Sequence, residues 1–184
     1  ISTRKVYKEK FNTKENDKIE TKCPYSKNKM TTEKQLFILL KKKLTILRVS
    51  NVIGLKRNLK NKRKIHKLFL DNYINFMKRK KIFIFNNNFK DFITIEQFCS
   101  TIYKIFKTQI YGIYNLSLGK KIYLKEIVAW LNVSKIRRII VNETIDKKNS
   151  FTLSNKKLSS KINIDFKKND VKKFCVKISN NNFR

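Results

Sequence analysis

The order of apolar and polar positions predicts that strands alternate with helices along this chain. Residues 24–40 read as a helix, because Pro24 suits a first helical turn and apolar side chains recur further along the segment. The apolar stripe of this helix is expected at Leu36, Leu39 and Leu40. Residues 44–50 alternate and are rich in β-branched side chains, and residues 1–6 read as the tail of another strand. A strand, a helix and a strand in this order predict a parallel βαβ unit and an α/β fold.

The rest of the chain continues this alternation. Thr94 and Gln97 have the spacing of a capping box, which places the start of a helix at residue 94. Further strands are predicted at 81–85, 111–116 and 138–141, and further helices at 56–81, 94–107, 124–131 and 171–178. Residues 7–23 are charged and polar, and we expect them to form a loop over the functional site.

The charge of the chain is strongly positive, with 45 Lys and Arg residues against 13 Asp and Glu residues and a net charge of +32. Such a balance is typical of proteins that bind nucleic acid or anionic membranes. Here lysine far outnumbers arginine and is spread along the chain, which favours solvated surfaces and only nonspecific, salt-sensitive nucleic-acid binding. A lysine-rich nucleic-acid-binding protein is the alternative interpretation. No apolar run reaches about 18 residues, so we expect no membrane partner.

Cysteine and histidine are too few and too dispersed to suggest a metal site or a disulfide framework. Cys23, Cys99 and Cys175 are far apart, and the chain has a single histidine. Reduced thiols in a cytoplasmic protein are the expectation, with no metal bound.

Tyr25 and Lys29 form the most informative pair of polar residues. At positions i and i+4 of the predicted helix they share one face. A cation beside a phenol favours the phenolate and lowers a pKa that is about 10 in model peptides, which suits a general acid or base. The spacing alone is weak evidence in so lysine-rich a chain, and Tyr103 and Lys107, which have the same spacing, are interpreted as ordinary helix surface.

The surroundings of this pair form an ordered set of segments. They are Ile1–Tyr7, Pro24–Lys29, Glu33–Leu36, Ile46–Gly54, Lys90–Ile93 and Gly112–Lys120. In this order and spacing the segments resemble the extended short-chain dehydrogenase/reductases, and among these the NAD-dependent nucleotide-sugar epimerase/dehydratase group. The resemblance runs from Ile1 to about Leu131 and is vaguer beyond.

The resemblance implies an enzyme built in two parts. Residues 1–50 would be the remnant of a Rossmann-type dinucleotide-binding domain, and residues 51–184 mainly a small α/β substrate-binding domain. The implied chemistry is hydride transfer between NAD or NADP and a sugar carbon of a nucleotide-sugar substrate. A nucleotide-sugar reductase of the same family stays open, as does a relative that binds nucleotide sugar without turnover.

The resemblance also implies roles for five residues. Tyr25 would be the catalytic acid or base, and Lys29 would bind the nicotinamide ribose and lower the tyrosine pKa. Thr3 would bond the reacting sugar oxygen. Asn51 and Lys90 would contact the diphosphate of the substrate. Lys90 stands where the family usually has arginine, and it offers a point charge in place of a bidentate fork.

The family's glycine-rich cofactor turn is missing. The three glycines, Gly54, Gly112 and Gly119, do not form the Gly-x-x-Gly-x-x-Gly pattern that holds a pyrophosphate at a helix amino terminus. In the resemblance, the first residues correspond to the end of a central strand. We therefore expect the carboxy-terminal part of a longer protein that lacks its amino-terminal βαβ units. The missing half is the expected partner, a homodimer is a further one, and the isolated chain should aggregate and lack NAD-dependent activity.

Overall fold

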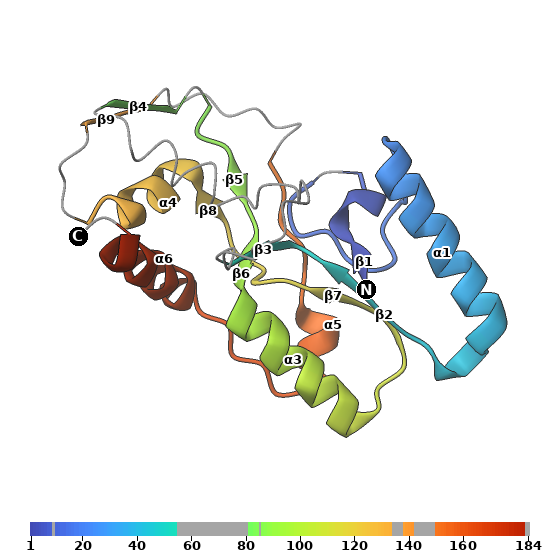
Figure 1. Ribbon diagram of the computed structural model, residues 1–184. Helices are drawn as coiled ribbons and strands as arrows, with labels where there is room; N and C mark the ends of the chain where they lie inside the picture. Colours follow the sequence, from blue (N-terminus) through green and yellow to red (C-terminus); the bar gives the residue numbers. More distant parts are fainter. Residues whose placement is uncertain (9, 55–80, 85, 134–137, 142–149, 183–184) are drawn as a thin grey trace, which may run out of the picture.

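A computed structural model describes residues 1–8, 10–54, 81–84, 86–133, 138–141 and 150–182 (Figure 1). The helical stretch predicted over 56–81 lies outside the described residues, except that residue 81 opens a strand.

The centre of the fold is a three-stranded parallel sheet. It has the order β1 (Ser2–Thr3), β2 (Thr45–Val49) and β7 (Gly112–Leu116). Thr3 pairs with Val49, which in turn pairs with Leu116, so the three strands end together. The sequence predicted the parallel arrangement of β1 and β2, and the structure confirms it.

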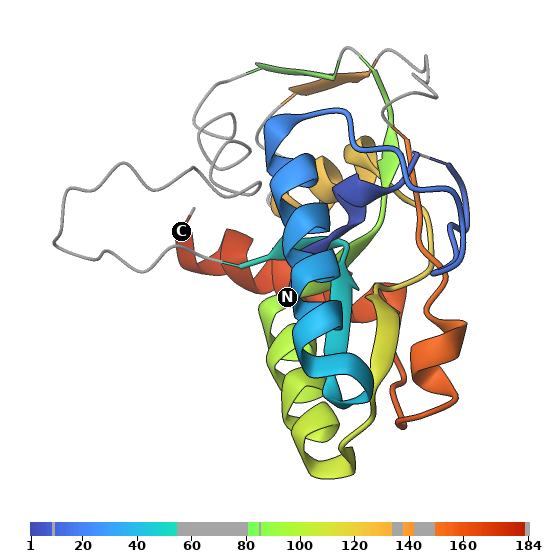
Figure 2. The same cartoon turned by 90° about the vertical axis from the view of Figure 1, so that its right-hand side faces the viewer.

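Two long helices flank this sheet on opposite faces (Figures 1 and 2). Because side chains alternate along β2, Ile46 lies with residues of α1 (Pro24–Leu40), whereas Leu47 lies with residues of α3 (Ile95–Thr108). Helices on both faces are what a buried parallel sheet requires. The arrangement is a Rossmann-like α/β fold.

The other described strands form three two-stranded sheets. β3 (Asn51–Ile53) pairs in parallel with β6 (Phe92–Thr94), β4 (Lys81–Ile84) in parallel with β9 (Arg138–Val141), and β5 (Phe89–Lys90) in antiparallel fashion with β8 (Ile122–Tyr123). The helices not yet described are η1 (Arg4–Val6), η2 (Lys41–Lys43), α4 (Leu124–Leu131), α5 (Lys156–Ser159) and α6 (Lys168–Asn182). The Ser179 hydroxyl donates to the Leu131 carbonyl at 2.7 Å, which joins α6 to α4.

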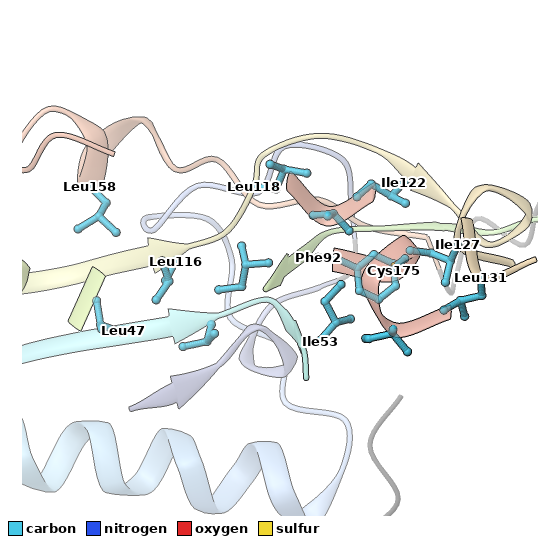
Figure 3. Close-up of a cluster of buried hydrophobic side chains, with 14 of the residues drawn as sticks. Leu47, Ile53, Phe92, Leu116, Leu118, Ile122, Ile127, Leu131, Leu158 and Cys175 are labelled. Carbon is cyan, nitrogen blue, oxygen red and sulfur yellow. The ribbon is translucent and has the colours of Figure 1, made fainter. Parts of the chain in front are cut away.

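One apolar core runs from the parallel sheet to α4 and α6 (Figure 3). Leu47 and Leu116 contribute from the sheet, Phe92 lies in the middle, and Leu131 and Cys175 close the far end. Since this cluster is continuous, the sheet and the α4–α6 pair are fixed relative to each other. β7 comes late in the sequence yet lies in the sheet of β1 and β2, and the division at residue 50 stays a prediction.

Most element predictions are confirmed. The helix at 24–40, the capping box of Thr94 and Gln97, the helix at 124–131 and the strand at 138–141 all stand as expected. The strand predicted for residues 1–6 ends at Thr3, because the Thr3 hydroxyl accepts from the backbone N–H of Lys5 and begins η1.

The predicted apolar stripe of α1 is wrong. Leu36, Leu39 and Leu40 are 38%, 75% and 47% exposed. The most buried residues of α1 are instead polar, Ser26 and Glu33. Helical periodicity identified an apolar set but could not tell which face meets the sheet, because the contacting face is held by polar contacts.

Candidate functional site

Two of the predicted site residues, Thr3 and Asn51, lie at the carboxyl ends of β1 and β2. Thr3 ends β1, is buried, and accepts from the backbone N–H of Lys5 at 3.3 Å. Its partner in the register, Val49, lies two residues before Asn51. In open α/β sheets, ligands bind at this end of parallel strands.

Tyr25 lies in the first turn of α1, which begins at Pro24. Tyr25 is 52% exposed, and the Lys5 ammonium lies 5.9 Å from the centre of its ring. Lys29, one turn further, donates from Nζ to the carbonyl oxygen of Ile1 at 3.2 Å. The structure thus brings Lys29 to β1 and Tyr25 to Lys5, and no described contact joins the Tyr25 hydroxyl to Lys29 or Thr3.

Asn51 and Lys90 come from neighbouring segments. The backbone N–H of Asn51 donates to the Asp91 carbonyl at 3.2 Å, and Asn51 pairs with Phe92 in the register of β3 and β6. Lys90 precedes Asp91 directly and pairs with Ile122. Both side chains are half-buried. The pairing of β3 with β6 thus brings two of the predicted substrate residues onto adjacent segments of backbone.

Asp91 is fully buried and binds backbone rather than facing solvent. Its Oδ1 accepts from the N–H of Leu118 at 2.8 Å, and its Oδ2 accepts from Gly119 at 3.0 Å and Leu153 at 3.1 Å. Burial raises the pKa of Asp91 to about 7, against the opposing effect of these three donors. Gly119 has a φ of 74°, which favours glycine at this turn. Asp91 therefore ties two loops together next to Lys90.

A buried ion pair lies behind the site. Arg48 Nη2 is 2.6 Å from Glu33 Oε2, and Arg48 Nε lies 3.1 Å from both carboxylate oxygens. Arg48 Nη1 also donates to the Tyr7 hydroxyl at 3.0 Å, and that hydroxyl donates to Asn115 Oδ1 at 2.9 Å. Burial raises the pKa of Tyr7 to about 12, although Arg48 opposes the shift. Burial also opposes the charged form of Arg48, but its hydrogen bonds to Glu33 and Tyr7 prevail and raise its pKa.

The sequence interpretation assigned no role to this polar network. One signal was present in the sequence: Arg48 is the one charged residue of a mainly apolar strand, and a buried charge requires a partner. Finding that partner needs the structure, because Glu33 and Tyr7 are distant from Arg48 along the chain.

The loop predicted over the functional site is held in place. Thr13 forms a parallel bridge with Leu153, and the backbone N–H of Ser154 donates to the Thr13 carbonyl at 2.8 Å. The Glu15 carboxylate accepts from the backbone N–H of Asn115 at 2.8 Å. These contacts join the loop to β7 and to the buried segment 150–154.

Other kinds of site find no support among the described residues. No described helix is long and apolar enough to cross a membrane, and no three His, Cys, Asp or Glu side chains in the described ranges are grouped to hold a metal. Cys23, Cys99 and Cys175 are unpaired.

The Rossmann-like fold is shared with solved structures of nucleotide-sugar enzymes. No protein-family model and no curated protein matches the sequence. RMD from Pseudomonas aeruginosa, complexed with NADPH, superimposes with a TM-score of 0.78 at 15% identity, over 97% of this chain and 64% of that chain. The UDP-Glc/GlcNAc 4-epimerase from Campylobacter jejuni gives 0.74 at 19% identity, over 97% and 62%.

A third structure extends this likeness. The dTDP-glucose 4,6-dehydratase from Bacillus anthracis, in complex with NAD, gives a TM-score of 0.70 at 16% identity, over 98% of this chain and 60% of that chain. At these identities the likeness establishes the fold, and it confirms the Rossmann-type α/β class predicted from the sequence. The chain spans about three fifths of the length of each of these three structures.

Proposed function

We propose that this chain supplies the Tyr–Lys part of the active site of an NAD(P)-dependent nucleotide-sugar epimerase or dehydratase. The proposal rests mainly on the Tyr25-x-x-x-Lys29 spacing on a helix whose Lys29 bonds Ile1, the residue directly before the first strand of a Rossmann-like sheet. The likeness of the whole fold to an NADPH-bound and an NAD-bound protein supports the same reading.

Each residue has a defined task in this proposal. Tyr25, as phenolate, accepts the proton of a sugar hydroxyl, and Lys29 stabilises the negative charge. Thr3 orients the sugar oxygen, while Asn51 and Lys90 hold the diphosphate. A nicotinamide cofactor, when bound, would supply the acceptor and donor for the hydride of the sugar carbon. The exposed Tyr25 side chain, with Lys29 one helical turn away, would take the ribose end of such a cofactor, whereas the described residues include no glycine-rich turn for its pyrophosphate.

A completing amino-terminal part belongs to the proposal. Among the described strands, β1 pairs with β2 only. An apolar cavity of about 460 Å³, lined by residues that include Ile1, Leu47 and Phe106, lies beside this strand. An unpaired strand edge and uncovered apolar surface favour association. The isolated chain is therefore expected to aggregate and to show no NAD-dependent turnover.

A second copy is the other proposed partner. Phe37, Ile38 and Leu39 at the end of α1 are all more than half exposed, and they form the surface on which a homodimer would pack. The proposed setting is the cytoplasm, where its three unpaired thiols stay reduced.

The decisive experiment is Tyr25→Phe in the chain joined to the upstream part of its reading frame. Loss of a general acid or base costs about 100- to 10,000-fold in turnover, so NAD(P)-dependent conversion of nucleotide sugar should fall by at least about 100-fold. Tyr103→Phe is the matched control, because Tyr103 also lies on a helix with a lysine four residues later and is 61% exposed. A loss below tenfold for Tyr25→Phe would remove this residue from the mechanism.

A further inference from the structure

A buried polar contact that the sequence pattern of α1 does not predict attaches this helix to the sheet. Glu33 accepts from the Ser2 hydroxyl and from three donor contacts of Arg48. Ser2 and Arg48 are partners in the register of β1 and β2, so one carboxylate spans two adjacent strands. All three residues are buried, with Glu33 only 4% exposed. The contact therefore fixes both the height and the rotation of α1 on the sheet.

Arg48 carries this restraint further. Its Nη1 donates to the Tyr7 hydroxyl at 3.0 Å and to the Glu15 carbonyl at 3.2 Å. The guanidinium thus joins α1, through Glu33, to Tyr7 after η1 and to Glu15 in the loop that follows. A planar fork with several fixed donors restrains orientation more than a single contact does.

A buried ion pair of this kind is weak evidence for stability. Replacing such a pair by apolar residues of similar size is often neutral or stabilising, whereas removing one partner alone costs about 3–5 kcal/mol. An apolar replacement would lose the directional hydrogen bonds that hold α1 to the sheet. The pair therefore matters mainly for the orientation of this helix.

We infer that Glu33 and Arg48 are positioning residues that set where α1 presents Lys29 and Tyr25 at the sheet. The inference rests on the proposed function for its catalytic meaning. An α-helix transmits a shift as a rigid rod, with a rise of about 1.5 Å per residue. Glu33 lies about 6 Å along the axis from Lys29 and about 12 Å from Tyr25 by this rise. If the contact of Glu33 with the sheet is removed, α1 can shift, and the hydrogen bond from Lys29 to the Ile1 carbonyl weakens.

The test uses the 184-residue chain at high dilution, where self-association is suppressed, and the double variant Glu33→Met/Arg48→Leu. Lysine amines are labelled with a limiting acylating reagent and quantified by mass spectrometry, with Lys27 of the same helix as the internal reference. Lys29 is half-buried and bonded to Ile1, whereas Lys27 is exposed. One hydrogen bond contributes about 1 kcal/mol, so labelling of Lys29 relative to Lys27 should rise by about two- to fivefold.

The matched control is Glu20→Gln/Lys22→Gln, which removes an exposed ion pair of 3.1 Å. It should leave the Lys29 to Lys27 ratio unchanged. An unchanged ratio in a double variant that unfolds at the wild-type urea concentration overturns the inference. If the double variant fails to fold, Glu33→Asp replaces it, because this change keeps the charge and shortens the side chain by one methylene. An unchanged ratio of Lys29 to Lys27 labelling in Glu33→Asp would also overturn the inference.

A second readout links the geometry to catalysis. In the completed enzyme, Glu33→Met/Arg48→Leu should lower kcat at least tenfold while the KM for nucleotide sugar changes little, since misplacement of about 1 Å can cost about 100-fold. An equal kcat would contradict the catalytic part of the inference. Absence of turnover in the unsubstituted enzyme would instead refute the proposed function, and the labelling ratio would still decide the positioning role.

Discussion

Asp91 should make the stability of this protein fall as the pH rises toward neutrality. Its carboxyl is fully buried, and burial raises its pKa to about 7. In the unfolded chain an aspartate titrates at about 3.9. Between these values the folded state binds the extra proton, so the contribution of Asp91 to the free energy of unfolding is complete below pH ~4 and is lost as the pH rises to ~7.

The magnitude follows from the difference between the two pKa values. About three units at about 1.4 kcal/mol each give about 4 kcal/mol for this carboxyl alone. Other groups oppose the trend, because hydrogen bonds to Lys14 and Lys10 lower the pKa of Asp17, which stabilises the fold as the pH rises. A comparison with Asp91→Asn isolates the one residue, since the variant keeps the shape but does not titrate.

The assay is urea unfolding at high dilution from pH 4.5 to 8, followed by the fluorescence of Trp130, the single tryptophan, which packs against the core. The free energy of unfolding of wild type minus that of Asp91→Asn should fall as the pH rises and should reach zero or change sign near neutrality. Asp91→Asn should also be less stable at low pH, because an amide cannot accept from all three N–H donors and an unsatisfied buried donor costs about 1–3 kcal/mol. A difference that is constant or grows with pH would refute this account.

Three further outcomes are expected. Leu39→Lys should reduce self-association in light scattering without loss of helical circular dichroism, because Leu39 is 75% exposed. Unchanged self-association would exclude the end of α1 as the surface of association. Thr94→Ala should lower the free energy of unfolding by about 1 kcal/mol through loss of the cap, and an unaltered urea midpoint would contradict the role of the capping box. Binding to random RNA should weaken steeply with salt, given the net charge of +32; tight binding that survives high salt would instead favour a nucleic-acid-binding protein.

Local signals were enough to predict most elements. The box of Thr94 and Gln97 begins α3, and the spacing of Val171, Cys175 and Ile178 matches the buried face of α6. These predictions succeed because caps and periodicity act within a few residues. The short helix α5 gave no such signal, and it was missed.

What the sequence could not predict depends on contacts between distant segments. The stripe of Leu36, Leu39 and Leu40 has the composition of a buried face, yet the sheet meets α1 through Glu33. Periodicity predicts which residues share a face but not which face is covered, because coverage depends on the partner surface. Likewise the pairing of β7 with β2 brings Asn115 to Tyr7 across 108 positions, and no local pattern encodes that contact.

The candidate site itself was predicted to different depths. The sequence identified Tyr25, Lys29 and Thr3 as a set, and the structure places Lys29 against Ile1, the residue directly before the strand that carries Thr3. Their joint catalytic role stays a prediction that the tyrosine variants will decide. The polar groups buried behind them went unassigned, although Arg48 breaks the apolar pattern of its strand.

That break in the pattern is itself informative. A strand residue that violates the local preference for apolar side chains must be compensated elsewhere, and such violations concentrate where function constrains the fold. Arg48 is compensated by Glu33 from the helix of the candidate site and by Tyr7 from the segment that follows Thr3. An apolar residue at position 48 would pack the sheet at least as well, but it would leave the helix without a fixed setting. The buried charge therefore sets the position of the helix that carries Tyr25 and Lys29, and in the proposed mechanism that pair depends on this position.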